Sequence, residues 1–341
     1  MKRRNMRYRS AVVLASLLLI LALAFFVAVW SGYTAMTAGD LLRIFLGGGS
    51  SKENLILFEF RMPRIVLGML AGMGFALAGM VMQTLTRNAL AEPGILGINA
   101  GAGLVVVVFL TLAGTLDMGA VMSLPFLALL GALLAGGLIY AFSVRKGQGL
   151  DPGKMVLNGI ALQLGLNAAT TFLALSLDAD QYKFVASFQA GSIWNTEWPM
   201  VTSLLPWILA GFVLLMLRAN VMNIFASGDE VSIGLGIHLR REKLLMLLTA
   251  LAVSAACVSA VGSMSFVGLV APHLARRLVG RRHQNLIPCS MLTGGILVVV
   301  SDAIARTVFQ PTMLPTGLVT SMVGAPYFII LLLTQRKKEL A

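Results

Sequence analysis

Long hydrophobic runs, separated by short polar segments, dominate the chain. Ten such runs lie at about 11–31, 62–84, 93–113, 119–143, 153–176, 198–218, 242–262, 266–279, 287–309 and 315–334. A helix needs roughly 20 apolar residues to cross the hydrocarbon core of a bilayer, and most of these runs approach that length. The run at 266–279 is shorter and more polar than the others. The pattern predicts an all-α polytopic membrane protein with ten transmembrane helices, in one transmembrane domain that covers residues 1–341.

The composition agrees with this class, since 58% of residues are hydrophobic and only 12% are charged. A soluble domain carries about twice that share of charge. The basic start, MKRRNMRYR, leads directly into a run long enough to remain as a span, so we expect no cleaved signal peptide. Cys257 and Cys289 both lie in or beside apolar runs. We predict buried free thiols there, not a disulfide.

Basic residues indicate the orientation, because lysine and arginine collect on the cytoplasmic side of membrane proteins. With a cytoplasmic amino terminus and ten crossings, 20 of the 26 basic residues fall inside. Without the run at 266–279, the basic cluster RRLVGRRH at 276–283 would fall outside. Both termini are therefore predicted to be cytoplasmic. The net charge of +12 has the same origin and does not call for a nucleic-acid partner.

Three of the remaining basic residues, Arg61, Arg64 and Arg306, stand at span ends on the predicted outer side. Their side chains can snorkel to lipid headgroups, or they can dock an acidic partner outside the cell. Asp302 is the one acid inside the ninth run, and it precedes Arg306 by four residues. The two can pair on one helix face.

The stretch 61–101 combines close-packing and polar signals. Glycines inside its first run allow helix backbones to approach closely in a bilayer; they are Gly68, Gly72, Gly74 and Gly79. Polar residues close this run and open the next one; they are Gln83, Arg87, Asn88 and Glu92. Charges beside apolar spans often mark a pathway or a docking point. The alternative interpretation is a tightly packed helix pair alone.

Two predicted outer connections are long. Segment 32–60 is predicted to carry a short helix around Asp40 to Leu46. Segment 177–197 is predicted to form a short helix at the mouth of a pore, with Trp194 and Trp198 at the membrane interface.

The inner segment 219–241 is neither a span nor a plain linker. Asp229 and Glu230 follow Ser227-Gly228, which is a helix-start signal, and Gly234 and Gly236 then break that helix. The pattern predicts a compact cytoplasmic knob of short helices. The alternative is a surface loop with amphipathic turns.

Signatures of catalysis do not stand out. The sequence has no Gly-rich loop that ends in Gly-Lys-Ser/Thr, so we expect no nucleotide site of that type on this chain. His238, His273 and His283 have no metal-ligand spacing, and His273 is predicted to be a hydrogen-bonded structural histidine. We therefore expect no enzymatic activity and no bound cofactor or metal. The sequence fits the passage of a solute across the membrane better than it fits catalysis.

Polar residues inside the spans are candidates for lining a solute path. They are Asn99, Asn158, Gln163, Asn167, Thr170 and Thr171. The alternative is that such groups bond to neighbouring helices.

Several stretches spread across the chain resemble the FecCD family of importer permeases, which includes vitamin B12 and ferric-siderophore permeases. They are RMPR at 61–64, GMGFALAGMVMQTLTRNALAEPGILGINAGA at 72–102, SGDEVSIGLGI at 227–237, GSMSFVGLVAPHLARRLVGRRH at 262–283, DAIAR at 302–306 and LPTGLVTSMVGAPYFIILL at 314–332. Any one of these stretches alone is a weak signal, but together and in family order they are specific.

The resemblance implies a type II ABC importer permease of ten spans in the bacterial cytoplasmic membrane. It implies a second permease subunit, identical or paralogous, two cytoplasmic ATPase subunits that hold ATP and Mg²⁺, and an extracytoplasmic binding protein. A ferric siderophore is the expected cargo, with haem or cobalamin as alternatives. An ion-coupled secondary transporter, which would want ionisable groups deep in its spans, and a membrane receptor are the rival classes.

The resemblance also assigns residues. Arg61, Arg64 and Arg306 match family arginines that grip glutamates of the binding protein, and Asn88 and Leu90 match a cytoplasmic gate. The coupling contact with the ATPase falls on segment 227–237, with Gly228, Asp229, Glu230, Gly234 and Gly236. The chain departs from the family pattern at Ala89, where proline is usual, and at Met313, where glutamate is frequent.

Overall fold

The computed structural model of the chain describes residues 2–31, 37–113, 118–145, 149–193, 196–308 and 313–339. Its long helices are α1 (Lys2–Trp30), α4 (Met62–Thr86), α5 (Ile98–Ala113), α6 (Met118–Ser143), α7 (Pro152–Ala174), α9 (Trp198–Leu217), α12 (Leu239–Val261), α13 (Val267–Val279), α14 (His283–Thr307) and α15 (Thr316–Glu339). The shorter elements are α2 (Ala38–Phe45), α3 (Ser51–Asn54), η1 (Leu55–Arg61), η2 (Pro93–Leu96), β1 (Val144–Arg145), β2 (Gly149–Leu150), α8 (Ala179–Gln189), α10 (Ala219–Phe225) and α11 (Asp229–Gly234).

The helices confirm the predicted all-α, multi-span class. Within the described residues, seven helices are long and apolar enough to cross a membrane, and two shorter apolar helices lie at Ile98–Ala113 and Thr316–Leu331. The run at 266–279 forms α13, which has 13 residues and is therefore only about 20 Å long. Since the hydrocarbon core is roughly 30 Å thick, a full crossing by α13, and with it the count of ten, stays a prediction.

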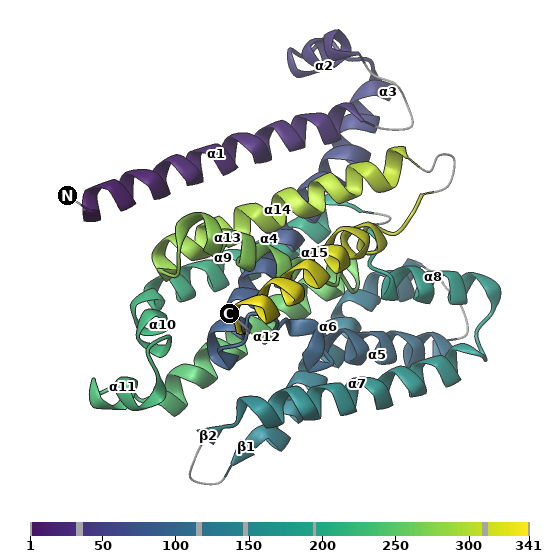
Figure 1. Ribbon diagram of the computed structural model, residues 1–341. Coiled ribbons are helices and arrows are strands. Elements are labelled where there is room, and N and C mark those ends of the chain that lie inside the picture. The colour runs from purple at the N-terminus through teal and green to yellow at the C-terminus, as the bar shows by residue number, and fades with distance from the viewer. Residues whose placement is uncertain are drawn as a thin grey trace.

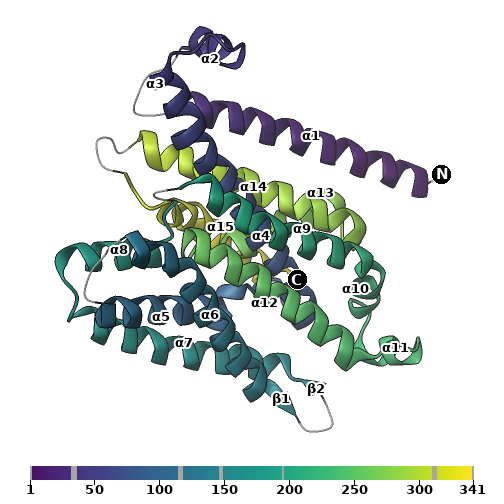
Figure 2. The ribbon, with the colours of Figure 1, turned by 180° about the vertical axis from the view of Figure 1, so that it is seen from behind.

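The connections between helices gather at two opposite ends of the bundle (Figures 1 and 2). One end carries α2, α3 and α8, and the other carries α10, α11 and the β1–β2 hairpin. Hydrogen bonds place the α12–α13 connection beside α8, through Ser263 N–H and Phe188 O at 3.1 Å. The start of α14 lies beside α10, through His283 N–H and Asn223 Oδ1 at 2.9 Å. We call the two ends the outer and inner ends, following the orientation that the charges predict.

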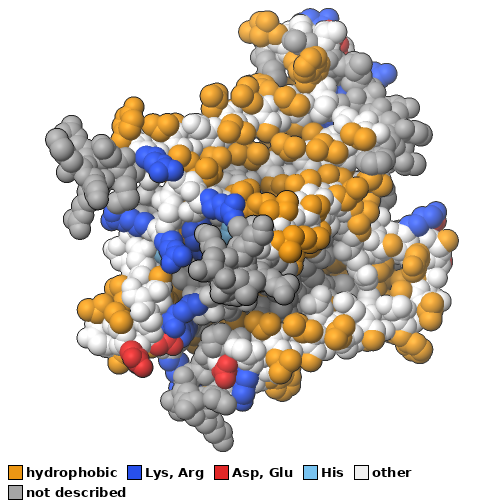
Figure 3. All heavy atoms as spheres, viewed as in Figure 1, with side chains coloured by type: hydrophobic (Ala, Val, Ile, Leu, Met, Phe, Trp, Pro, Cys, Tyr) orange, Lys and Arg blue, Asp and Glu red, His pale blue; other side chains and the backbone are white. Residues whose placement is uncertain are grey.

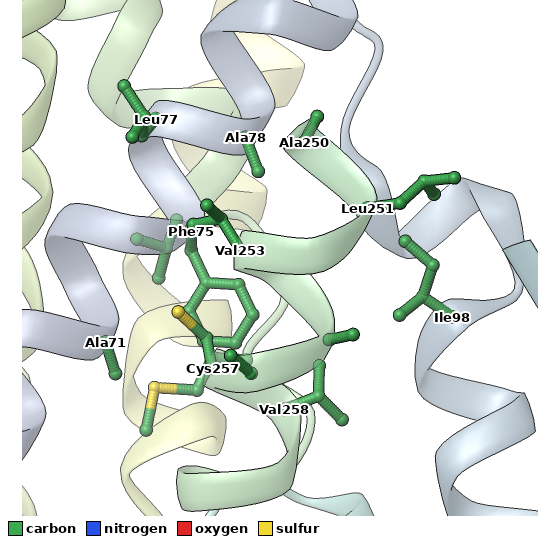
Figure 4. Close-up of a cluster of buried hydrophobic side chains, with 14 of the residues drawn as sticks. Ala71, Phe75, Leu77, Ala78, Ile98, Ala250, Leu251, Val253, Cys257 and Val258 are labelled. Carbon is green, nitrogen blue, oxygen red and sulfur yellow. The ribbon is translucent and has the colours of Figure 1, made fainter. Parts of the chain in front are cut away.

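Helix α4 is the central helix, packed against α9, α12, α13 and α14. Its glycines make this packing close, as the sequence indicated. A Cβ on Gly72 would overlap the carbonyl oxygen of Gly294 in α14, and one on Gly79 would overlap that of Gly268 in α13. Figure 4 shows the apolar cluster beside these contacts, built from α4, α12 and α5, with Ile98 pointing toward Leu251.

The sides of the bundle are apolar. Helix α1 exposes Leu19, Leu23 and Phe26, with 62%, 56% and 60% of each residue accessible. Figure 3 shows hydrophobic side chains over the long helices, while lysine and arginine gather toward the end that carries α10 and α11. This distribution suits a protein whose flanks meet lipid and whose inner end meets the cytoplasm.

Some of the short elements confirm predictions, and others were not predicted from the sequence. Helices α2 and α8 confirm the predicted short helices in the two outer connections, although Trp194 lies outside the described residues. Unexpectedly, α3 and η1 continue into α4 as one helical stretch, Ser51–Thr86, and a hairpin joins α6 to α7. Both cysteines are free and buried, as predicted.

Candidate functional site

At the outer end, one buried carboxylate holds two guanidinium groups. Arg64 Nη2 lies 2.9 Å from Asp302 Oδ1, and Arg306 Nε lies 2.9 Å from Asp302 Oδ2. The Thr316 hydroxyl donates to Asp302 Oδ1 at 3.0 Å. The side chain of Asp302 is only 3% exposed, against 13% for Arg64. The predicted pairing of Asp302 with Arg306 is confirmed, and Arg64 is an additional partner.

The same arginines brace the outer end of α1. Arg306 donates to Ser31 O and Ala28 O, both at 3.1 Å, and Arg61 donates to Val29 O at 2.9 Å. Arg61 and Arg306 are each 6% exposed, so both groups point into the protein. Binding-protein docking by these arginines stays a prediction, and Arg64 is the one of the three that reaches a cavity.

This outer cavity has a volume of about 620 Å³. Charged residues at its rim are Arg64, Asp180 and Lys183, and its walls include Phe184, Phe188 and Met313. Asp180 and Lys183 form an exposed pair at 3.4 Å. The outer end therefore offers a largely apolar hollow with charges at its edge.

Three glycines lie where the end of α8, the α12–α13 connection and the start of α15 meet. The N–H of Gly317 in α15 donates to Gly191 O at 2.7 Å. A Cβ on Gly191 would overlap Ser263 O, and one on Gly262 would overlap Phe188 O. Gly191 and Gly262 also have positive φ values of 76° and 71°, which side chains with a Cβ resist. The end of α8, the α12–α13 connection and the start of α15 are thus held in direct backbone contact.

A second cavity has a volume of about 390 Å³ and is mainly polar. Five of the six polar residues singled out as path candidates line it; they are Asn99, Gln163, Asn167, Thr170 and Thr171. Asn158 lies elsewhere and donates to Phe142 O and Ser143 Oγ. The structure therefore brings together residues from α5 and α7, while their role in solute passage stays a prediction.

Most of these polar groups form hydrogen bonds within the protein. Asn99 donates to Ser263 Oγ at 2.7 Å, and the hydroxyls of Thr170 and Thr171 donate to carbonyls of their own helix. Asn167 and Thr171 are exposed, and only 11% of the apolar window of α7 is buried. A polar, exposed helix face is costly against lipid, so this face indicates water or a partner subunit.

Glu92 also lines this polar cavity, although it is not among the residues that the sequence predicts for the path. Its Oε2 accepts the backbone N–H of Phe266 at 3.1 Å. Phe266 precedes α13 and has a φ of 68°, in the left-handed region. Among the described residues Glu92 makes no ion pair. Its place directly between two apolar runs is the sequence signal that could have identified it.

At the inner end, the predicted gate residues form a tight turn after α4. Asn88 Oδ1 accepts the N–H of Leu90 at 2.9 Å, and the N–H of Ala91 donates to Asn88 O at 3.2 Å. This side-chain turn shapes the loop although Ala89 replaces the usual proline. Asn88 is exposed and Leu90 is half-buried.

The gate loop is tied to the predicted coupling segment. Arg87, which ends α4 with a φ of 52°, donates to Phe225 O at 3.3 Å and pairs with Asp229. Lys243 at the start of α12 reaches the other oxygen of Asp229 at 2.7 Å. Burial acts to raise the pKa of Asp229, but Lys243 and Arg87 hold the pKa below its usual value. The carboxylate thus stays charged and joins three elements.

The rest of the coupling segment is open. Helix α11 starts at Asp229 and ends at Gly234, as the sequence indicated. Glu230 is exposed. Gly228 and Gly236 have φ values of 120° and 79°, and no atom lies within 4 Å of a Cβ built on either residue or on Gly234. The segment is a compact knob with a free surface.

The prediction for His273 is wrong. Both of its ring nitrogens are buried without a hydrogen-bond partner in the described structure, because the ring packs edge-on against Tyr327 with centroids 5.8 Å apart. The hydrogen-bonded histidine is His283, whose ring nitrogens lie 3.0 Å from Thr84 Oγ1 and 2.9 Å from Asn223 Oδ1.

Comparison with known proteins shows which family the chain belongs to. The sequence pattern described as the FecCD transport family matches residues 19–334. The chain belongs to the FecCD transport family. Within this FecCD permease, the match covers every cavity and contact described above.

Relatives of the FecCD permease are similar over almost the whole chain. The iron(3+)-hydroxamate import system permease protein FhuG of Bacillus subtilis is 41% identical over 94% of this chain and 96% of its own length. The iron-uptake system permease protein FeuC of the same organism is 38% identical over 94% and 96%. The cobalamin import system permease protein BtuC of Halobacterium salinarum is 35% identical over 84% and 75%.

A solved structure shares the fold. It is an inward-facing conformation of a metal-chelate type ABC transporter, with a TM-score of 0.83 and 24% identity, over 94% of this chain and 99% of that one. The protein is thus a multi-pass membrane permease subunit of a bacterial ABC importer. Its partners include an ATPase, which carries the ATP hydrolysis, and a binding protein.

Proposed function

We propose that this FecCD permease passes a ferric siderophore from an extracytoplasmic binding protein to the cytoplasm. The main structural support for this proposal is the polar cavity of about 390 Å³ between α5, α7 and the α12–α13 connection. Support for the cargo comes from the relatives named for iron(3+)-hydroxamate import and iron uptake. Haem and cobalamin remain the alternative cargoes, and a cobalamin permease is among the relatives.

The path itself runs along the exposed polar face of α7. A second permease subunit, identical or paralogous, covers this face and completes the cavity from the other side. Two half-sites, each lined by amides and hydroxyls such as Asn167 and Thr171, then surround a bulky solute. This arrangement removes the cost of presenting polar groups to lipid.

The outer end receives the binding protein. Arg64 stands at the rim of the outer cavity, with its side chain 13% exposed and paired with Asp302, and Lys183 on the same rim offers the more exposed positive charge. Arg61 and Arg306, which bond to α1 carbonyls, hold the helices that position Arg64. Acidic side chains of the binding protein meet this edge.

The inner end converts ATP-driven motion into gating. The open knob around Gly236 seats on the ATPase, and Asp229 passes its movement to Arg87 at the end of α4. Arg87 precedes the Asn88–Leu90 turn directly, so a shift of the knob moves the gate. Binding energy that differs between the two states of this gate is what drives the change. Both termini lie in the cytoplasm, and two ATPase subunits act on the permease pair.

Vesicle reconstitution tests the function. The permease is placed in vesicles with its second subunit, ATPases and loaded binding protein, and uptake of radioactive iron as the siderophore complex is measured. We expect uptake that needs ATP and stops with vanadate, whereas haem and cobalamin do not compete. Uptake driven by an ion gradient without ATP would indicate a secondary transporter, and specific binding without uptake would indicate a receptor.

A further inference from the structure

We propose that the turn between α13 and α14 binds the phosphate of an anionic phospholipid at the inner surface of the membrane. Four arginines mark this segment, which we call the arginine turn; they are Arg276, Arg277, Arg281 and Arg282. None of them lines either of the two cavities described above. The inference therefore concerns a contact with the bilayer and does not depend on the cargo.

Positive charge is concentrated at the arginine turn. Arg276 is half-buried in the last turn of α13. Arg281, which follows Gly280 with its φ of 81°, lies close enough to Arg276 to repel it. Arg276 also repels positive charge on His283, the first residue of α14. Like charges at a half-buried position are costly unless an anion joins them.

The chain itself does not supply that anion among its described residues. No acid of the described structure lies within ion-pair distance of the arginine turn. Within the same residues, one side-chain hydrogen bond involves the four guanidinium groups, from Arg282 to Gln284 Oε1 at 3.2 Å. Asp229 and Glu242, two acids of the inner end, pair with other basic residues. The arginine turn therefore has the charge to bind an anion from outside the chain.

The arginine turn lies at the level of the membrane surface. Helix α1 packs against α13 and α14, and Asn285 donates to Ser10 Oγ at 3.0 Å, so the start of α1 stands beside the turn. Tyr8, two residues before Ser10, is 75% exposed, and tyrosine is typical of the headgroup level. In Figure 3, basic side chains at the inner end border the hydrophobic flank.

Apolar side chains near the turn favour a lipid over an acidic protein segment. Val12 of α1 and Leu278 of α13 are 47% and 40% exposed, and such surfaces suit acyl chains. Guanidinium groups bind phosphate oxygens through paired hydrogen bonds, and basic clusters at the cytoplasmic surface attract anionic headgroups. A zwitterionic lipid brings its own ammonium, which the arginines repel. A phospholipid with net negative charge therefore fits both parts of this surface.

Lipid retention by the purified transporter, with all its subunits, tests the site. The complex is delipidated in neutral detergent and titrated with phosphatidylglycerol or phosphatidylcholine, and bound lipid is measured by native mass spectrometry. We expect phosphatidylglycerol to bind about tenfold more tightly than phosphatidylcholine, and Arg276→Gln combined with Arg281→Gln to remove most of this preference. Glycerol 3-phosphate, which carries the phosphate without acyl chains, should not displace the lipid.

Arg240→Gln combined with Arg241→Gln is the matched control. It removes the same charge from two exposed positions at the start of α12, also at the inner end, and should keep the preference for phosphatidylglycerol. If the Arg276 variant does not assemble, Arg277→Gln combined with Arg281→Gln changes exposed residues only and should reduce the preference by about threefold or more.

Four results would overturn the lipid site. Equal binding of the two lipids, or an equal loss in the control, would show that the arginine turn has no selective role. Displacement by glycerol 3-phosphate would indicate a site for soluble phosphates. Unchanged lipid binding together with loss of the ATPase from the complex would assign the arginines to a protein partner.

Discussion

Asp302 shows how much one side chain can hold together in this protein. Its carboxylate receives Arg64 from α4, Arg306 from its own helix and Thr316 from α15. A buried ion pair contributes little compared with an apolar replacement, but removing one partner leaves the other charge buried and unpaired. The network is therefore sensitive to the loss of its single acid.

We predict that Asp302→Asn destabilises the permease by about 3–5 kcal/mol, because two buried guanidinium groups lose their counter-charge. Thermal unfolding of the purified protein in detergent measures this. Asp180→Asn is the control, since Asp180 and Lys183 are 86% and 76% exposed and an exposed pair contributes about 1 kcal/mol or less. Equal stability of the two variants would contradict the network. For the same reason Arg64→Glu, which places a second acid beside Asp302, would disturb folding before it tests docking.

At the scale of elements, direct contacts join the α10–α11 knob to the end of α4. Arg87 bonds to Phe225 of α10 and to Asp229 of α11, and Lys243 of α12 completes the contact. All of these partners lie at the inner end, whereas the free surface of the knob faces away from the bundle. We therefore expect a partner that binds the knob to act on the loop at Asn88 and Leu90 through the contacts of Arg87.

Gly236→Glu tests this unit. The substitution adds bulk and charge to the open surface of the knob, and we predict that the ATPase co-purifies poorly or hydrolyses ATP without driving uptake. A charge left unpaired in a packed interface costs several kcal/mol. Binding-protein docking at the outer end should survive.

Gly47→Glu is the matched control for this test. Gly47 also has a positive φ, 86°, and open space around its Cβ position, but it lies in the outer connection. Both variants therefore carry the same backbone strain. Gly49, in the same connection, would be a poorer control, because its Cβ would lie 2.8 Å from Asn54 Oδ1 and 2.9 Å from Ile44 Cγ1. Normal transport by Gly236→Glu with its ATPase attached would exclude the coupling assignment.

At the scale of the whole molecule, we propose that the chain forms half of a solute path, which a second permease subunit completes. The polar cavity is lined by residues of α7, a helix with little buried surface, and Asn88, in the turn after α4, is exposed at the inner end. Both features support this proposal, with the second subunit placed across the face of α7.

We predict that cysteines at Asn88 or Leu90 cross-link to their counterparts in the second subunit, with a yield that changes when nucleotide binds the ATPases. The loop would approach its counterpart in one state and separate in the other. Gel mobility without reductant measures the yield, and the native Cys257 and Cys289 are buried and do not interfere. A cysteine at Leu18, which is 55% exposed on the apolar flank of α1, should not cross-link. A yield that ignores nucleotide would argue against gating at this turn.

The sequence by itself determined the helices, the inner knob and the set of polar residues that the fold gathers. These are local properties: apolar runs set the span ends, Gly228 and Gly236 mark turns, and Asn167, Thr170 and Thr171 already share one helix. The resemblance of positions 72–102 and 227–237 to a family pattern likewise indicated the function from the sequence alone.

Local spacing predicted the pair of Asp302 with Arg306, but only the tertiary structure decided which charges pair between distant segments. Arg64 and Asp302 stand 238 positions apart, and Arg87 and Asp229 stand 142 apart, so no local spacing reports these contacts. Glu92 stands between two apolar runs in the sequence, but only folding shows that α5, α7 and the α12–α13 connection surround it, with no paired cation among the described residues. His273 was predicted to form hydrogen bonds, but in the folded protein its ring packs against Tyr327 and its nitrogens have no hydrogen-bond partner in the described structure. Burial and pairing depend on segments that meet only in three dimensions.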